Sequence, residues 1–241
     1  LEKWVIERRI DILEKEGIEF KCGVNVGVDL DVDELKERYD AVILTGGAED
    51  WRDLPVPGRE LKGAYQAMEF LPQQNRRNSE IALGDIEEIN AKDKKVIVIG
   101  GGDTGSDCVG TSNRQGAESV TQLEILPCPP DQRTGDNPWP EWAKIKRVST
   151  SHLEGVVQEY SVLTKSLEGE NGVLKKLNAV RVEFGEPDPE TGRQPMTEVE
   201  GSEFTLECDL IFLAMGFLGP RKEGMIESLG IELDGRGNIK T

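Results

Sequence analysis

Six consecutive residues in the middle of the chain have the spacing of a phosphate-binding turn. They are Gly100, Gly101, Gly102, Asp103, Thr104 and Gly105, and they follow the apolar, β-branched run 96–99. Between a strand and a helix, the first glycine of G-x-G-x-x-G allows a sharp bend, the second lets a pyrophosphate approach, and the third lets the helix pack closely. The N–H groups and the dipole of the helix also favour phosphate charge. The pattern predicts a dinucleotide site, with a glycine turn that binds no ligand as the alternative. Asp103 would either approach the pyrophosphate or cap the helix.

The next predicted strand, 119–126, carries a carboxylate that would select the dinucleotide. Glu124 lies nineteen residues after Gly105, where it can accept hydrogen bonds from ribose hydroxyls and would repel a 2′-phosphate. No Arg or Lys is next to it in sequence, and the nearest one downstream is Arg133. This favours NADH over NADPH. The alternative is that Glu124 is a solvated strand-end residue and that the Pro-rich loop 127–142 contacts the ribose.

The Pro-rich loop holds three further candidates. Arg133 would either reach a phosphate or remain a mobile loop cation. Trp139 and Trp142 would either cover the adenine or nicotinamide ring, or pack against the partner domain. A loop of this length inside a compact domain is usually functional or mobile.

Two other turns follow strands of the buried type and are candidates for contact with a ligand. They contain Thr45, Gly46 and Gly47 after the predicted strand 41–45, and Ala214, Met215 and Gly216 at the end of the predicted strand 208–215. Ligands of α/β sheets bind at the C-terminal ends of strands. An ordinary tight turn explains each of them equally well.

Hydrophobic spacing predicts alternating helices and strands on both sides of the glycine turn. Helices are expected at 1–16, 33–39, from 67 onward, from the turn to about 115, and at 223–229. Strands are expected at 18–22, 41–45, 96–99, 119–126 and 208–215, with a β-meander at 156–184 and 203–207 whose turns lie at 169–172 and 185–193. The polar stretch 73–78 is interpreted as a crossing between domains. Because the first helix follows no strand, we expect the chain to begin partway through a domain.

Composition argues against several classes of function. The formal net charge of −17 repels nucleic acid and anionic membrane surfaces. The apolar runs are far shorter than the roughly 18 residues of a membrane span, and no secretory leader opens the chain. Four cysteines without a C-x-x-C pair predict buried thiols in a reducing cytoplasm and no metal site. The only histidine, His152, is expected to be structural or on the surface, and no set of catalytic side chains is found.

Four segments together resemble the small (beta) subunit of glutamate synthase. They are residues 40–48, 100–108, 137–140 and 209–217, which read DAVILTGGA, GGGDTGSDC, NPWP and DLIFLAMGF. The resemblance implies an α/β fold with two Rossmann-like dinucleotide-binding units of the two-dinucleotide flavoprotein reductase type, together with the β-meander. It implies a partial FAD domain at 1–72, an inserted NAD(P)-binding domain at 73–207, and a return to the partial FAD domain at 208–241.

The resemblance also implies a function in glutamate biosynthesis. In that family NAD(P)H gives a hydride to FAD, and electrons pass through iron–sulfur clusters to the large (alpha) subunit, which makes glutamate from 2-oxoglutarate and glutamine-derived ammonia. The family's FAD glycine fingerprint would precede Leu1, its closing flavin motif would follow Thr241, and its cysteine-rich segment is missing. We therefore expect this chain to be inactive alone. The alternatives are a catalytically silent nucleotide-binding or assembly module, and another NAD(P)H-dependent flavoprotein reductase.

Overall fold

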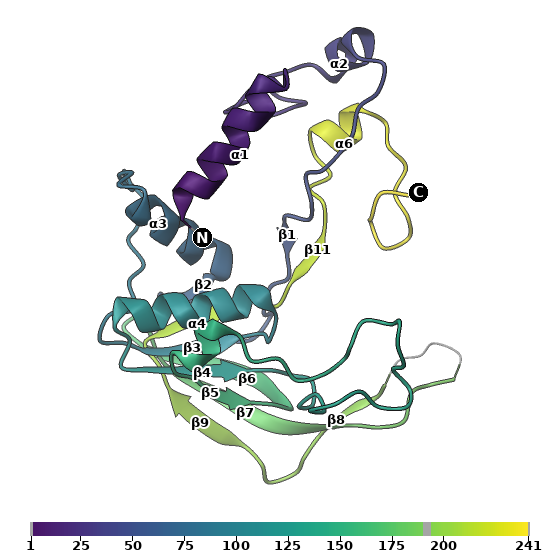
Figure 1. The fold of residues 1–241 in the computed structure, drawn as a ribbon. Coiled ribbons are helices and arrows are strands. Elements are labelled where there is room, and N and C mark those ends of the chain that lie inside the picture. Colours follow the sequence, from purple (N-terminus) through teal and green to yellow (C-terminus); the bar gives the residue numbers. More distant parts are fainter. Residues whose placement is uncertain (1, 190–193, 241) are drawn as a thin grey trace. The chain divides into compact units, whose positions relative to one another are not determined.

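The computed structural model describes residues 2–189 and 194–240 (Figure 1). The first residue of the expected helix 1–16, residues 190–193 of the expected turn, and residue 241 lie outside the described residues. The chain divides into two compact units, one made of Leu1–Asp50 and Phe217–Thr241 and the other of Trp51–Gly216. The domain boundaries expected after residues 72 and 207 both fall inside the second unit.

A five-stranded parallel sheet forms the centre of the second unit. Its order is β2 (Ala64–Gln66), β10 (Leu210–Leu213), β3 (Lys95–Ile99), β4 (Ser119–Leu123) and β5 (Val157–Glu159). All four residues of β10 and the three central residues of β3 are buried. Strands covered on both faces are apolar along their whole length, which explains the continuous apolar runs in the sequence.

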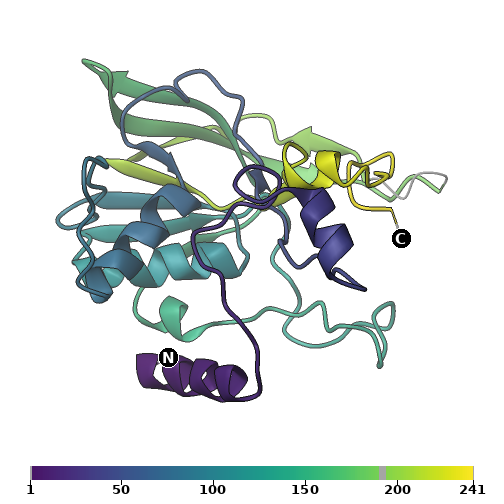
Figure 2. The same cartoon turned by 90° about the horizontal axis from the view of Figure 1, so that it is seen from above.

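Each face of this sheet is covered by a different kind of layer (Figure 1). Helices α3 (Ala67–Asn78) and α4 (Asp103–Gln115) cover one face and lie side by side (Figure 2). The other face packs against the antiparallel strands β6 (Val162–Glu170), β7 (Val173–Phe184), β8 (Met196–Glu198) and β9 (Phe204–Glu207). These strands confirm most of the predicted meander, although residues 157–159 of the expected span form β5 of the parallel sheet. The hairpin turn uses Asn171 and Gly172, both with positive φ.

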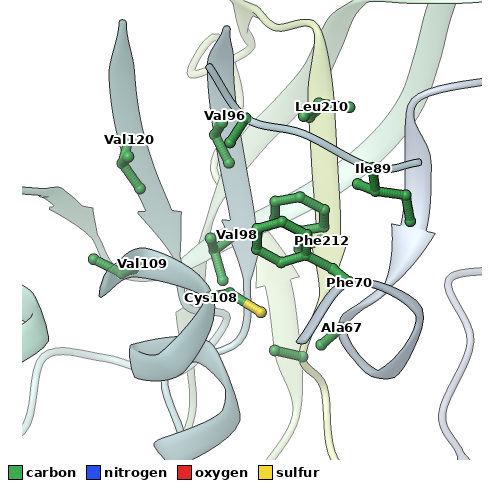
Figure 3. Packing of buried hydrophobic residues seen from close by; sticks show 12 residues of the cluster. Ala67, Phe70, Ile89, Val96, Val98, Cys108, Val109, Val120, Leu210 and Phe212 are labelled. Carbon is green, nitrogen blue, oxygen red and sulfur yellow. The ribbon is translucent and has the colours of Figure 1, made fainter. Parts of the chain in front are cut away.

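The core between the helices and the sheet centres on two stacked aromatic rings (Figure 3). The ring centroids of Phe70 from α3 and Phe212 from β10 lie 4.0 Å apart with an interplanar angle of 9°. Val98 from β3 and Cys108 from α4 are fully buried in the same cluster. This core fixes β3 and α4 together, and so it fixes the turn that joins them.

Helix α3 includes the polar stretch that the sequence analysis interpreted as a domain crossing. The helix begins with a capping box in which the N–H of Gln66 donates to Glu69 Oε2 at 2.7 Å. It continues through Pro72 to Asn78. Gln73 is buried because its amide group pairs with the carbonyl of Glu87 and the N–H of Ile89. Residues 73–78 are therefore part of a packed helix.

The described residues of the first unit, 2–50 and 217–240, contain three helices and little sheet. Its helices are α1 (Lys3–Lys15), α2 (Val32–Arg38) and α6 (Met225–Ser228), and the short strand β11 (Phe217–Gly219) pairs with β1 (Asp50–Trp51). Asp31 caps α2 by accepting a hydrogen bond from the N–H of Asp33.

Two strand predictions in the first unit are wrong. Segments 18–22 and 41–45 are irregular, and the side chain of Ile43 is 85% exposed. A strand needs a neighbour for its N–H and C=O groups, and among the residues that the structure describes no strand pairs with either segment.

Candidate dinucleotide-binding site

A cavity of about 260 Å³ opens beside the β3–α4 turn in the second unit. Gly101, Gln122 and Glu124 line it. Its lining also includes Pro127 from the Pro-rich loop, Lys146 shortly after that loop, and Tyr160 directly after β5. The predicted glycine turn therefore faces an open crevice at the C-terminal ends of the parallel strands, where ligands of such sheets bind.

The three key glycines have the geometry that their spacing predicts. Gly100 has φ +119°, and a Cβ there would overlap the carbonyl of Ala214. A Cβ on Gly105 would overlap the Gly100 carbonyl and come within 2.8 Å of Gln122 Nε2. At Gly102, by contrast, a Cβ would meet no atom within 4 Å. The chain is thus tightly packed at the first and third glycines and open at the second, where a pyrophosphate would approach.

Helix α4 begins directly after this opening. Gly102 is its N-cap residue, and Asp103 and Thr104 are its first two residues. Asp103 therefore does not cap the helix, and the cap position has no side chain. The N–H groups of a helix's first turn lack partners inside the helix, which leaves them available to an anion.

Glu124 directly follows β4, beside the glycine turn. Its Oε2 accepts a hydrogen bond from the N–H of Gly101 at 2.7 Å, and its Oε1 accepts one from the N–H of Leu126 at 3.1 Å. A Cβ on Gly101 would come within 2.5 Å of Oε2. The structure thus brings Glu124 into contact with the glycine turn.

A series of hydrogen bonds connects Ser149 to the glycine turn through His152 and Gln122. The N–H of Ser149 donates to Nδ1 of His152 at 3.1 Å, so the ring proton of neutral His152 lies on Nε2. Nε2 donates to Gln122 Oε1 at 2.9 Å, and Gln122 Nε2 donates to the Gly100 carbonyl at 2.9 Å. Burial lowers the pKa of His152, which favours this neutral form. His152, in the short helix α5 (Thr150–Leu153), is therefore structural.

The Pro-rich loop is held by its own polar side chains. Arg133 donates to the carbonyls of Asn137 at 3.0 Å and Glu141 at 2.7 Å, and it does not line the cavity. Asn137 is 1% exposed and binds three groups of the same loop. Trp139 and Trp142 remain exposed, at 83% and 76%. Arg133 thus stabilises the loop by binding two of its carbonyl groups.

The sequence alone does not point to Lys146 and Arg147. No Arg or Lys is adjacent to Glu124 along the chain. The loop nevertheless returns these two residues to the cavity that Glu124 lines. No spacing rule connects positions 124 and 146, so only the tertiary structure could reveal them.

The two strand-end turns lie in different compact units. Gly46 and Gly47 line a cavity of about 280 Å³ in the first unit, together with Leu44, Arg221 and Met225, whereas Thr45 does not line it. Ala214, Met215 and Gly216 follow β10 in the second unit, where the Ala214 N–H donates to the Ile99 carbonyl at 2.8 Å.

The four cysteines differ in their surroundings. Cys108 and Cys208 are buried, and burial raises the pKa of the Cys208 thiol to about 12 and that of Cys108 further. Cys22 and Cys128 are exposed, which corrects the expectation that all four are buried. Residues 2–189 and 194–240 contain no helix that is long and apolar enough to cross a membrane.

Comparisons with known proteins identify the family. Residues 3–241 match the family model described as pyridine nucleotide-disulphide oxidoreductase. The chain is 47% identical over 242 residues to the glutamate synthase (NADPH) small chain of Mycobacterium tuberculosis. This match covers 99% of this chain and 48% of that protein. It is 46% identical over 250 residues to glutamate synthase (NADH) of Schizosaccharomyces pombe. That match covers 100% of this chain and 12% of that protein. The resemblance to glutamate synthase found in the sequence is confirmed.

A solved structure shows the same fold. FprA from Mycobacterium tuberculosis in complex with NADPH superposes with a TM-score of 0.62 at 17% identity, covering 90% of this chain and 58% of that one. The chain spans about half the length of the glutamate synthase small chain that it matches. Together with the two-layered covering of its parallel sheet and the glycine turn, these matches show that the chain belongs to the pyridine nucleotide-disulphide oxidoreductase family.

Proposed function

We propose that this chain binds NAD(P)H at the β3–α4 turn and is the electron-input part of a glutamate synthase. The observation that carries the proposal is the opening at Gly102: a Cβ there would meet no protein atom within 4 Å, and Glu124 binds the N–H of the preceding Gly101. A diphosphate bound there would receive hydrogen bonds from main-chain N–H groups and the favourable field of the helix dipole.

The adenosine ribose is proposed to lie next to Glu124. A carboxylate can accept hydrogen bonds from both ribose hydroxyls and repels a 2′-phosphate. On this ground NADH is the favoured coenzyme. The names of the relatives do not decide the question, because one is named for NADPH and another for NADH.

FAD is the proposed acceptor of the hydride, and the first unit has features that fit part of it. A Cβ on Gly46 or Gly47 would meet no atom within 4 Å, so the backbone there can be approached closely. The adjoining cavity of about 280 Å³ is also lined by Arg221, whose guanidinium lies 3.6 Å from the carboxylate of Glu49 and could instead bind a phosphate. When bound, FAD supplies the redox chemistry, and the protein supplies binding and orientation. No side chain of this chain is assigned acid–base work.

The proposed partner is the large (alpha) subunit of glutamate synthase, with iron–sulfur clusters outside this chain. The support is the similarity to proteins named as the small chain of that enzyme. Electrons taken from NAD(P)H would leave through this partner for the reductive synthesis of glutamate.

The proposal is tested by titrating the protein with NADH and NADPH while following nicotinamide fluorescence. A second experiment adds FAD without oxygen and follows the loss of oxidised-flavin absorbance. We expect saturable binding of NADH and a weaker response to NADPH. Because this chain is expected to be inactive alone, binding without reduction of added FAD fits a chain that holds only part of the flavin site, and reduction would show that this part is sufficient for hydride transfer. Failure to bind either nucleotide would contradict the proposal.

A further inference from the structure

We propose that Lys146 and Arg147 form a phosphate subsite in the cavity beside Glu124, which binds the 2′-phosphate of NADPH. The inference rests on the proposed function and deepens it. Glu124 alone would exclude NADPH, whereas this pair of cations would allow NADPH to bind as a second coenzyme. Two opposing determinants would then set the coenzyme preference.

The carboxylates of the cavity already have partners. Glu124 accepts hydrogen bonds from the N–H groups of Gly101 and Leu126. Glu159, the other acidic residue that lines the cavity, is bound at 2.6 Å by the guanidinium of Arg181, which comes from β7. Neither carboxylate is paired with a cation that lines the cavity. Burial lowers the pKa of His152 and raises that of Tyr160, so neither of these two groups of the cavity adds a charge at neutral pH.

The two cations of the cavity have no such partners. Among residues 2–189 and 194–240, no carboxylate lies within ion-pair distance of Lys146 or Arg147. This is notable in a chain with 46 acidic and 29 basic residues. Two neighbouring cations without acidic partners repel each other. An anion in the cavity that both residues line would supply the counter-charge that they lack.

Both cations are nevertheless positioned by contacts. The N–H of Lys146 donates to the Pro130 carbonyl at 2.8 Å, and its ammonium lies 5.9 Å from the ring centroid of Tyr160. The guanidinium of Arg147 lies 4.2 Å from the ring centroid of Trp142. Contacts with aromatic faces orient a cation without neutralising it. Most of the N–H donors of Arg147 remain available for phosphate oxygens, which an arginine binds through two parallel hydrogen bonds.

The location in the cavity indicates which phosphate would bind. The diphosphate is assigned to the open position at Gly102, on the turn itself. Lys146 and Arg147 line the same cavity as Glu124, which is assigned to the ribose. The group of a dinucleotide that projects from this ribose is the 2′-phosphate of NADPH, and NADH lacks it.

The test compares ADP-ribose with 2′-phospho-ADP-ribose, because both contain the diphosphate and only the second contains the 2′-phosphate. Calorimetric titration of wild type, Lys146→Gln, Arg147→Gln and the double variant gives the affinities. We expect each single substitution to weaken 2′-phospho-ADP-ribose roughly tenfold, as for loss of one charge-assisted hydrogen bond, and to leave ADP-ribose unchanged. Lys94→Gln removes one positive charge from an exposed side chain just before β3, at the end remote from the turn, and serves as the matched control.

The outcomes separate this inference from the proposed function. Equal weakening of both ligands would place the cations at the diphosphate and overturn the inference, as would no weakening of either. Both of these results would leave the binding of ADP-ribose by the wild type, and thus the proposed function, standing. Failure of the wild type to bind ADP-ribose would remove the proposed function, and this inference with it. Circular dichroism of each variant confirms that an altered affinity does not come from unfolding.

Discussion

The carboxylate of Glu124 accepts a hydrogen bond from the backbone N–H of Gly101, with 2.7 Å between Oε2 and N. The contact joins the end of one parallel strand to the turn after its neighbour, two segments that are 23 residues apart. A carboxylate at this place shapes the turn and also faces the cavity. Its removal should therefore affect both nucleotide affinity and coenzyme choice.

Replacing Glu124 by alanine tests its role at the ribose. We expect Glu124→Ala to weaken NADH binding about tenfold, since hydrogen bonds to a charged group contribute about 1.5–3 kcal/mol. Discrimination against NADPH should decrease, because the repulsion of the 2′-phosphate is lost. Fluorescence titration with both nucleotides measures the two affinities. Glu118→Ala is the control, since Glu118 is exposed at the opposite end of β4. An unchanged ratio of NADH to NADPH affinity would contradict the assignment of Glu124.

Gly105 should tolerate no side chain. A Cβ there would overlap the Gly100 carbonyl and crowd Gln122. We expect Gly105→Ala to lower the free energy of unfolding by about 1–3 kcal/mol, the usual cost of overpacking, and to weaken NADH binding. Urea unfolding and NADH titration measure the two effects. Gly135→Ala is the matched control, because a Cβ at Gly135 would meet no atom within 4 Å. Equal stability of the two variants would show that the helix is not packed as closely as described.

His152 should make stability depend on pH. Burial lowers the pKa of His152 in the folded protein below its ordinary value of 6.5, so between these two values the unfolded chain binds more protons. The free energy of unfolding therefore rises with pH across this window. The contribution is fully present above 6.5 and is lost as the pH falls through the folded-state pKa.

Comparison of wild type with His152→Gln isolates this contribution. The chain contains one histidine, so the difference between the two urea-unfolding series reports on that group. We expect the difference to be largest at neutral pH and to shrink on acidification. A difference that grows as the pH falls would mean that folding favours the protonated ring, contrary to the hydrogen bond from Ser149.

The stacked pair Phe70 and Phe212 should dominate the stability of the second unit (Figure 3). We expect Phe212→Ala to cost about 3–5 kcal/mol of unfolding free energy, the typical cost of removing a buried aromatic side chain. Phe20→Ala is the comparison, because Phe20 is 47% exposed and its loss should cost little. Chemical denaturation of both variants measures the effect, and similar costs would contradict the placement of Phe212 in the core.

The local pattern was sufficient to predict the site's backbone. The run 96–99, the turn at 100–105 and the stop at Gly116 specify β3 and α4 because each signal acts over a few residues. Glu124 could also be predicted, since the length of a strand–helix–strand unit fixes how many residues separate it from the turn.

Features that depend on distant neighbours could not be predicted in this way. Segments 18–22 and 41–45 have strand-like composition, but no described strand pairs with them. The polar residues 73–78 resemble a linker in the sequence, and only the structure shows that Gln73 is hydrogen-bonded to the backbone of Glu87 and Ile89. Lys146 and Arg147 reach the cavity only through the path of the Pro-rich loop.

The most direct test of the central claim is the affinity of Gly102→Val for NADH. Gly102 has φ −81° and ψ −174°, which valine can adopt, and a Cβ there would meet no protein atom within 4 Å. The substitution should lower the unfolding free energy by no more than about 1 kcal/mol, because Gly102 is the N-cap of α4 and valine is a poorer N-cap residue than glycine. It should nevertheless abolish NADH binding, because the side chain fills the place of the diphosphate. A stable Gly102→Val variant that binds NADH as tightly as the wild type would contradict the account.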